Sequence, residues 1–222
     1  VIFISIFDTI FLVNFMEKTT IFLIRHSEQL KIKSLLNSSE NSQIANEKII
    51  LSVKGEKKAE ELSNIAELSN LDSVWCSNYV RALATAKYIA ERNNLEVQIS
   101  TDLNERKLGN LDSLSKLSDK YTHPFTTEQL LDEKVKNEDG ENRIEVNTRM
   151  TNFINNLLTE YSGAKIAIVS HGAAIKFLLM NWCLLNQNFD LVYKDTILKI
   201  DSPSVIKLEF NKDSLINLSQ LY

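Results

Sequence analysis

Short apolar runs alternate with amphipathic segments along most of the chain. Residues 19–24 (TTIFLI) and 165–170 (KIAIVS) are apolar without alternation, which is typical of strands buried on both faces of a parallel sheet. Further strands are expected at 72–77, 95–99 and 205–210, and apolar residues at helical spacing predict helices within 52–69, 78–94, 146–161 and 173–185. This alternation predicts a three-layer α/β/α sandwich with a mainly parallel central sheet and right-handed crossovers.

Two segments depart from this alternation. Residues 1–15 are almost entirely apolar, yet they are shorter than the roughly 20 residues of a membrane span and lack the basic start and cleavage site of a secretory signal. We interpret them as an extension that precedes a functional start at Met16. Residues 110–142, which include His123, are polar and irregular, and we interpret them as an insert or lid on a single domain spanning 16–222.

Composition limits the classes of partner. The chain has 222 residues and a formal net charge of -4, so a general affinity for nucleic acid or an anionic membrane is not expected. Any anion site must therefore be formed locally by a few residues. Its two cysteines, Cys76 and Cys183, are far apart and outside any metal-binding spacing. This argues against a disulfide framework and a zinc cluster, and it favours a reducing cytoplasm.

Two of the three histidines follow the two most strand-like runs. His26 comes directly after residues 19–24 and Arg25, and His171 follows residues 165–170. Because the carboxyl ends of parallel strands meet at one edge of a sheet, we expect both histidines to lie in one site. Metal ligation is the competing explanation, but the fixed charge of Arg25 would repel a divalent ion. We therefore expect neither a metal nor an organic cofactor.

Five segments in order along the chain resemble the histidine phosphatase superfamily, the phosphoglycerate-mutase-like proteins. The first and last contain the two histidines, and the resemblance extends from about Thr19 to about Phe210. The segments are LIRHSEQ (23–29), CSNYVRALATA (76–86), LNERKLGNLD (103–112), DGENRIEVNTRM (139–150) and IVSHGAAI (168–175). The resemblance implies a metal-independent enzyme that transfers the phosphoryl group of a small phosphorylated substrate.

The resemblance also implies a role for each residue of the site. His26 is the expected nucleophile, and Glu105 is the expected proton donor to the leaving alcohol. Arg25 and Arg81 offer planar donor forks to phosphate oxygens, and His171, if protonated, adds a further donor. These five are the expected catalytic residues. The expected substrate-binding residues are Arg25, Arg81, His171, Gly172, Ser27 and Gln29.

The phosphate loop departs from the family pattern. Ser27 stands where the family usually has glycine, and Gln29 stands where it has serine or threonine. Ile32 replaces a phosphate-binding asparagine, and residues 111–113 replace an aromatic-acid-glycine turn. These changes bear on activity and substrate choice, although all five expected catalytic residues are retained.

Three functions fit these observations. The first is a phosphatase that hydrolyses phosphate monoesters of a small metabolite. The second is a cofactor-dependent phosphoglycerate mutase, but residues 107–142 contain no arginine to bind the second anionic group of a phosphoglycerate. The third is a non-catalytic phosphate-binding module. Trp182 and the apolar segment around it are candidates for the contact of a homodimer.

Overall fold

The computed structural model describes residues 18–31, 42–109, 132–136 and 138–222. The extension 1–15, Met16, Ile32, residues 111–113, His123 and most of the expected insert lie outside the described residues.

A six-stranded sheet forms the centre of the molecule, in the order β3-β2-β4-β1-β8-β9. Strands β3, β2, β4 and β1 are parallel to one another. At one side of the sheet, β8 pairs antiparallel with β1, and β9 pairs antiparallel with β8. The predicted mainly parallel sheet is therefore confirmed. The strands are β1 (Lys18–Arg25), β2 (Ser73–Cys76), β3 (Val97–Ile99), β4 (Lys165–Ser170), β8 (Ser204–Asn211) and β9 (Ser214–Gln220).

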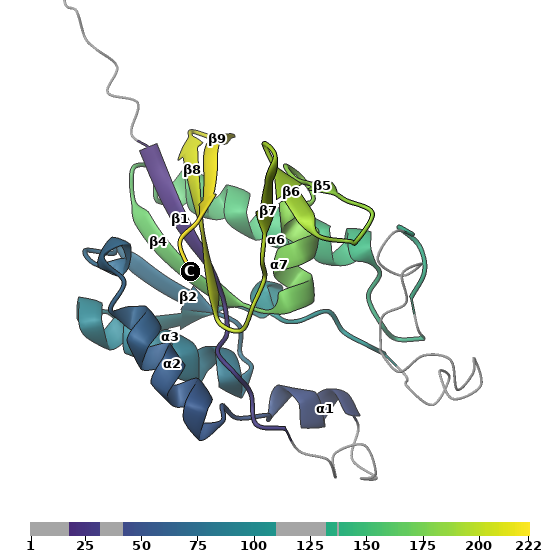
Figure 1. Ribbon diagram of the computed structural model, residues 1–222, viewed down its shortest axis with the longest axis horizontal. Helices are drawn as coiled ribbons and strands as arrows, with labels where there is room; N and C mark the ends of the chain where they lie inside the picture. Colours follow the sequence, from purple (N-terminus) through teal and green to yellow (C-terminus); the bar gives the residue numbers. More distant parts are fainter. Residues whose placement is uncertain (1–17, 32–41, 110–131, 137) are drawn as a thin grey trace, which may run out of the picture.

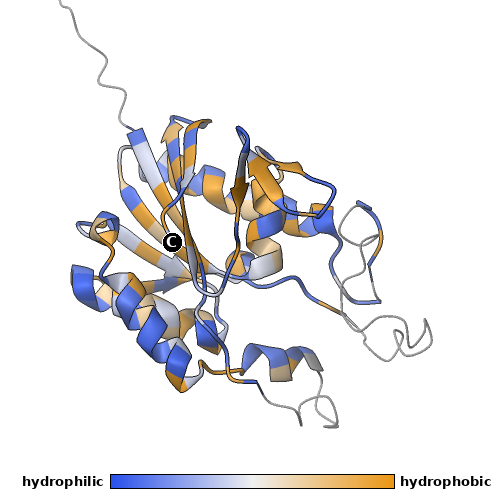
Figure 2. Ribbon diagram, in the orientation of Figure 1, coloured by the Kyte–Doolittle hydropathy of each residue, from blue (hydrophilic) through white to orange (hydrophobic). Residues whose placement is uncertain are grey.

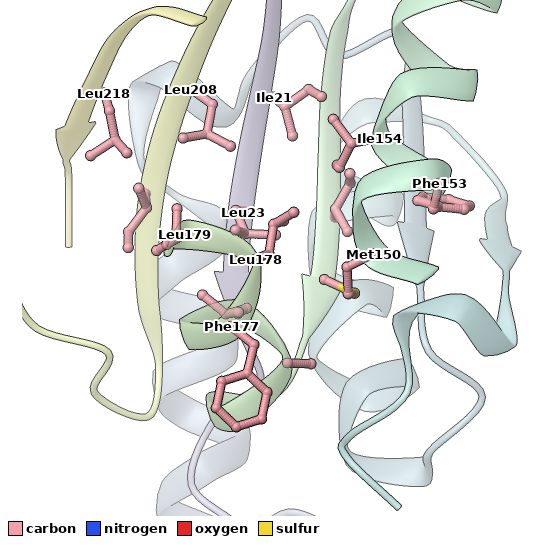
Figure 3. Packing of buried hydrophobic residues seen from close by; sticks show 14 of the residues in the cluster. Ile21, Leu23, Met150, Phe153, Ile154, Phe177, Leu178, Leu179, Leu208 and Leu218 are labelled. Carbon is pink, nitrogen blue, oxygen red and sulfur yellow. The ribbon is translucent and has the colours of Figure 1, made fainter. Parts of the chain in front are cut away.

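Helices cover both faces of the sheet (Figure 1). Phe22 and Ile24 of β1 belong to the apolar cluster on the side of α2 (Val53–Ser63) and α3 (Val80–Asn93). Ile21 and Leu23 belong to the opposite cluster, with α6 (Arg143–Glu160) and α7 (Gly172–Leu179), as Figure 3 shows. Each of these β1 side chains is at most 1% exposed. Burying such a side chain contributes about 1.5–3 kcal/mol to stability. The unbroken apolar run of β1 thus reflects burial on both of its faces.

Local signals fix the bounds of the helices. Asn142 and Glu145 form a reciprocal capping box at the start of α6. Ser52 caps α2, and Asn94 ends α3 in the left-handed conformation, with a φ of 54°. Shorter elements complete this part of the fold, namely α1 (Ser42–Glu47) and the 3₁₀ turns η2 (Ala66–Leu68) and η3 (Thr101–Leu103).

Several expected elements differ in extent. The helix expected within 52–69 ends at Ser63, and the helix expected within 78–94 begins at Val80, with Tyr79 at its cap position. The helix expected at 173–185 ends at Leu179, because Leu184 and Leu185 pair with a neighbouring strand. That pairing belongs to a small sheet not predicted from the sequence, made of β5 (Leu184–Leu185), β6 (Leu191–Tyr193) and β7 (Thr196–Leu198).

Figure 2 shows that apolar residues follow the central strands and the inner sides of the helices, with polar residues outside. Trp182 packs edge-on against Phe210, with ring centroids 5.8 Å apart, so it contributes to the fold of its own chain. In the described part of the chain, no helix has both the length and the apolar character needed to cross a membrane.

Candidate active site

The two histidines meet at the carboxyl end of the parallel strands. Arg25 pairs with Ser170 at the end of the β1–β4 ladder, and His26 N donates to Ser170 O at 2.9 Å. This register places the rings of His26 and His171 edge to face, with centroids 5.1 Å apart. The strand ends therefore bring together the two histidines as the sequence pattern predicts.

The ring of His26 is held in one orientation. Its Nδ1 lies 2.7 Å from Ser27 O, and its Nε2 lies 3.1 Å from Arg81 Nε. A carbonyl oxygen only accepts, so Nδ1 carries the hydrogen and Nε2 presents a lone pair. Burial and the charge of Arg81 lower the pKa of His26 to about 3. At neutral pH this imidazole is therefore a neutral group with an unprotonated Nε2, as a nucleophile requires.

Arg81 contacts the nucleophile from the first turn of α3. Its side chain is almost fully buried, and its guanidinium lies over the ring of Tyr79, 4.9 Å from the centroid. Nη1 donates to Asn46 O at 2.6 Å, which ties α1 to the site. These contacts leave a planar cation beside His26 Nε2.

Arg25 lies on the other side of the site and depends on a glycine. Its Nη1 donates to Ile200 O at 2.5 Å, while its Nε is buried with no hydrogen-bond partner among the described residues. A Cβ on Gly172 would lie 3.1 Å from Arg25 Cζ, closer than most real contacts. Gly172 therefore lets the guanidinium pack directly on the start of α7.

Glu105 directs its carboxylate toward the same helix start. Oε1 accepts from Ala174 N at 3.1 Å and Arg106 N at 2.9 Å, and Oε2 accepts from Ala173 N at 3.3 Å. These backbone donors fix the direction of the carboxylate.

His171 is completely buried behind His26. Its Nε2 lies 2.6 Å from Ser77 Oγ, which itself accepts from Tyr79 N at 3.2 Å. Burial and neighbouring charges hold the pKa of His171 well below its usual value, so the neutral ring is the form at neutral pH. The protonated His171 considered from the sequence is therefore not favoured in this arrangement. Its Nδ1 has no hydrogen-bond partner among the described residues.

Ser27 and Gln29 were both expected to bind substrate, but only Gln29 lies at the pocket. The Ser27 hydroxyl donates to Gly55 O at 2.7 Å, and its backbone N–H donates to Thr85 Oγ1 at 3.0 Å. Ser27 therefore joins the phosphate loop to α2 and α3, and it does not line the pocket. Gln29 does line it.

A pocket of about 310 Å³ lies between these side chains. Arg25, His26, Arg81 and Glu105 all line it, so four of the five expected catalytic residues face one cavity. Its remaining lining residues are Glu28, Gln29, Lys31, Asn46, Leu108 and Ser202. Two arginines beside an uncharged nucleophile fit a phosphate group. Among the described residues, no group of three or more histidine, cysteine, aspartate or glutamate side chains is arranged to hold a metal ion.

Comparisons with known proteins agree with this geometry. The family model of the histidine phosphatase superfamily (branch 1) matches residues 21–217. The chain belongs to the histidine phosphatase superfamily. A comparison with curated proteins finds no match.

Several solved structures of other proteins resemble the chain in fold. A mycobacterial glucosyl-3-phosphoglycerate phosphatase shares 18% identity, with a TM-score of 0.67 over 91% of this chain and 97% of its own. YhfR from Bacillus stearothermophilus shares 20% identity, with a TM-score of 0.63 over 89% and 94%. A phosphoglycerate mutase from Bacillus anthracis shares 19% identity, with a TM-score of 0.62 over 92% of each chain. At these identities the likeness concerns the fold.

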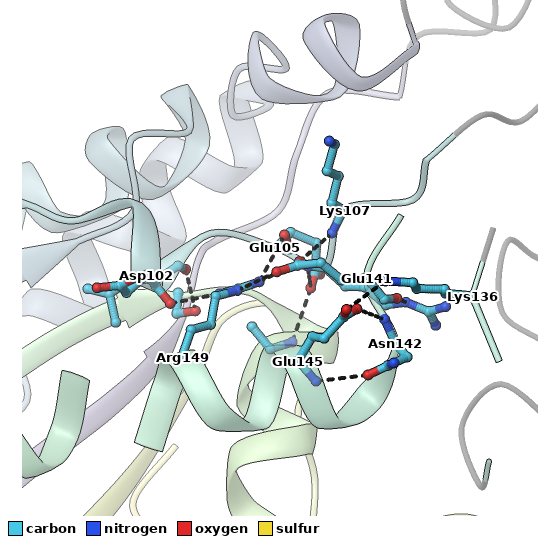
Figure 4. Close-up of polar contacts among 12 residues, drawn as sticks. Asp102, Glu105, Lys107, Lys136, Glu141, Asn142, Glu145 and Arg149 are labelled. Atoms are coloured by element: carbon cyan, nitrogen blue, oxygen red, sulfur yellow. Dashed lines mark hydrogen bonds and ion pairs between the residues drawn. The ribbon is translucent and has the colours of Figure 1, made fainter. Parts of the chain in front are cut away.

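A polar network anchors the acid-bearing loop of this histidine phosphatase superfamily member (Figure 4). Arg149 of α6 binds both carboxylate oxygens of Glu141, at 2.8 and 2.9 Å, and donates to Asp102 O at 2.7 Å. Glu141 also accepts from Lys107 N at 2.8 Å. The segments before and after Glu105 are thereby fixed to one helix.

Five pocket residues were not expected from the sequence, and three of them, Lys31, Asn46 and Ser202, lie outside every segment of the resemblance. Ser202 Oγ donates to His26 O at 2.7 Å, because the antiparallel pairing of β1 with β8 brings the segment before β8 to the strand end. No local motif marks these residues. A prediction of strand register would have been needed to find them.

Proposed function

We propose that this protein is a phosphatase that hydrolyses phosphate monoesters of a small metabolite through a phosphohistidine at His26. The observation that carries the proposal is the neutral His26 ring, whose Nε2 accepts from Arg81 in a small pocket that Arg25 also lines. A nucleophile in this state needs no general base. Arg25 and Arg81 supply charge for the equatorial oxygens of the phosphoryl group.

The reaction then proceeds in two displacements. In the first, His26 Nε2 bonds to phosphorus as the bond from phosphorus to the alcohol oxygen breaks, and protonated Glu105 gives the leaving oxygen its proton. In the second, water bonds to phosphorus as the nitrogen–phosphorus bond breaks, and Glu105 takes a proton from that water. Inorganic phosphate leaves, and both residues return to their starting forms.

The test is covalent labelling during turnover. Protein mixed with an aryl phosphate and denatured within milliseconds should carry one phosphoryl group on the peptide containing His26, and steady-state hydrolysis should survive a chelator. His26→Ala should lose both label and turnover. Arg81→Ala should lower kcat/KM by about 10²–10³-fold, as loss of a transition-state donor does, whereas Arg92→Ala, at the exposed end of the same helix, should not.

Other outcomes identify the alternatives. Hydrolysis that persists in His26→Ala, or that requires added metal, would exclude the covalent mechanism. A stable phosphohistidine that passes its phosphoryl group to a phosphoglycerate rather than to water would indicate a mutase. Phosphate binding with neither label nor turnover would indicate a binding module.

A further inference from the structure

A second cavity adjoins the phosphate pocket on the side of the acid loop. Its volume is about 790 Å³, compared with about 310 Å³ for the phosphate pocket. Arg25 and Glu105 line both. The guanidinium of Arg25 and the carboxylate assigned as proton donor therefore face both cavities. Its volume falls within the range of about 300–1,000 Å³ typical of small-molecule sites.

The wall of this cavity comes from the small sheet and the first turn of α7. Leu191 of β6 and Leu198 of β7 are 1% and 4% exposed and form an apolar part of the lining. Phe189 and Ile200 are half-buried and extend it. The cavity thus offers apolar surface that a phosphate group alone does not use.

The turn that carries Phe189 is built with unusual support. Phe189 has a φ of 62°, a conformation that bulky residues rarely adopt. Asn186 Oδ1 accepts from Asn188 N and Asp190 N, at 2.8 and 2.9 Å, and Lys176 Nζ of α7 donates to Phe189 O at 2.5 Å. These bonds hold an aromatic side chain in the cavity wall despite the unfavourable backbone.

The charges around the cavity are balanced. Its cationic lining residues are Arg25, Lys176 and Lys199, and its acidic lining residues are Glu105, Asp190 and Asp201. A second anionic group on the substrate would face carboxylates, and a cationic group would face ammonium groups. Hydroxyl groups on a substrate can bind both kinds of charged side chain, because they donate to carboxylates and accept from ammonium groups.

We propose that this cavity binds the alcohol part of the substrate, and that this alcohol is an uncharged, polyhydroxylated group of sugar size. The inference rests on the proposed phosphatase function and specifies its substrate class. The ring face of a sugar packs on Phe189 and Ile200, its hydroxyls bond to the lysine and aspartate side chains, and the ester oxygen lies beside Glu105. When the bond from phosphorus to that oxygen breaks, Glu105 is in place to protonate it.

The test compares esters that share a phosphate group and differ in the alcohol. Glucose 6-phosphate and ribose 5-phosphate should have kcat/KM values at least 10-fold above those of 3-phosphoglycerate, a phosphoserine peptide and methyl phosphate. Phe189→Ala should raise KM for the preferred sugar ester about 10-fold and leave methyl phosphate unchanged, whereas Phe189→Tyr should retain most of the affinity. Thermal unfolding of each variant establishes that it is folded.

The outcomes separate this inference from the function on which it rests. If methyl or aryl phosphate is hydrolysed through His26 but 3-phosphoglycerate or the peptide is preferred, the assignment of the cavity is wrong and the phosphatase stands. The same holds if a folded Phe189→Ala treats sugar esters as the unaltered protein does. If no ester is hydrolysed and His26 is never labelled, the proposed function itself fails.

Discussion

Replacement of Arg149 tests whether the network beneath the acid loop positions Glu105. Arg149→Met removes the two bonds to Glu141, the bond to Asp102 O and the 3.4 Å bond to Glu105 O. It also leaves the Glu141 carboxylate, with its side chain 23% exposed, without its cation. Removing one member of a charged hydrogen-bonded pair costs about 1.5–3 kcal/mol, and partial exposure moderates this value. We expect a loss of about 2 kcal/mol in the free energy of unfolding. For a chain of this size the midpoint should fall by about 4–8 °C.

The catalytic effect should appear in kcat. Arg25 and Arg81 hold the phosphate from other elements, so KM should change less than about 3-fold. A displacement of Glu105 by about 1 Å should lower kcat by about 10–100-fold. Lys136→Met is the matched control, because it breaks an ion pair in which both side chains are at least 40% exposed, and such pairs contribute about 0–1 kcal/mol. Thermal unfolding and steady-state kinetics on an aryl phosphate measure both effects.

Two results would refute this reasoning. A folded Arg149→Met variant with kcat within about 3-fold of the unaltered protein would show that the network stabilises the fold without positioning the acid. A KM effect larger than the kcat effect would place Arg149 in substrate binding. The double variant Glu141→Gln/Arg149→Met should regain part of the lost stability, because it no longer leaves an unpaired carboxylate.

Three further predictions follow from single contacts. The pKa of His26 is lowered to about 3, so its ring should stay neutral from pH 8 down to pH 5 in an NMR titration. Its contribution to stability should be lost as pH falls from about 6.5 toward 3. A titration midpoint near 6.5 would contradict the burial argument. Gly172→Ala should displace the Arg25 guanidinium and raise KM about 10-fold, with little change in unfolding temperature. Hydrogen bonds from Lys18, which has the largest effect, and from Asn217 and Lys207 lower the pKa of Glu209 to about 2. The stability difference between the unaltered protein and Lys18→Met should therefore be largest above pH 4.5 and should disappear as pH falls toward 2. A difference that does not depend on pH would refute this.

The elements that the sequence predicted well are those whose pattern has one physical cause. The strands β1 and β4 are buried on both faces, and their ends carry His26 and His171, so apolar runs and chemistry coincide. Arg81 was predicted because it lies in the first turn of α3, directly after the short segment that follows β2. These features depend on local spacing and on the rule that parallel strands end at one edge.

The features that were missed depend on contacts between distant segments. The apolar run after α7 was expected to continue the helix, but Leu184 is 78% exposed and pairs with β6 instead. Strand pairing in the folded protein overrides the weak helical preference of this segment. Ser27 was expected at the phosphate because of its place in the motif, whereas its hydroxyl bonds to Gly55 O from α2. Nothing in either local sequence specifies these partners.

The contact between Arg81 and His26 connects the resting site to its chemistry. In this structure the Nε2 lone pair of His26 accepts from Arg81 Nε, so the expected nucleophile and an expected phosphate-binding cation are hydrogen-bonded to each other. A phosphoryl group in the pocket would offer Arg81 stronger, charged acceptors, and we expect Arg81 Nε to turn to them and to release the lone pair. Binding and activation of the nucleophile are then one event. An uncharged ligand of the same shape gains nothing by displacing Arg81. We therefore expect the site to select phosphate before any bond is made, and selection among alcohols to depend on the neighbouring cavity.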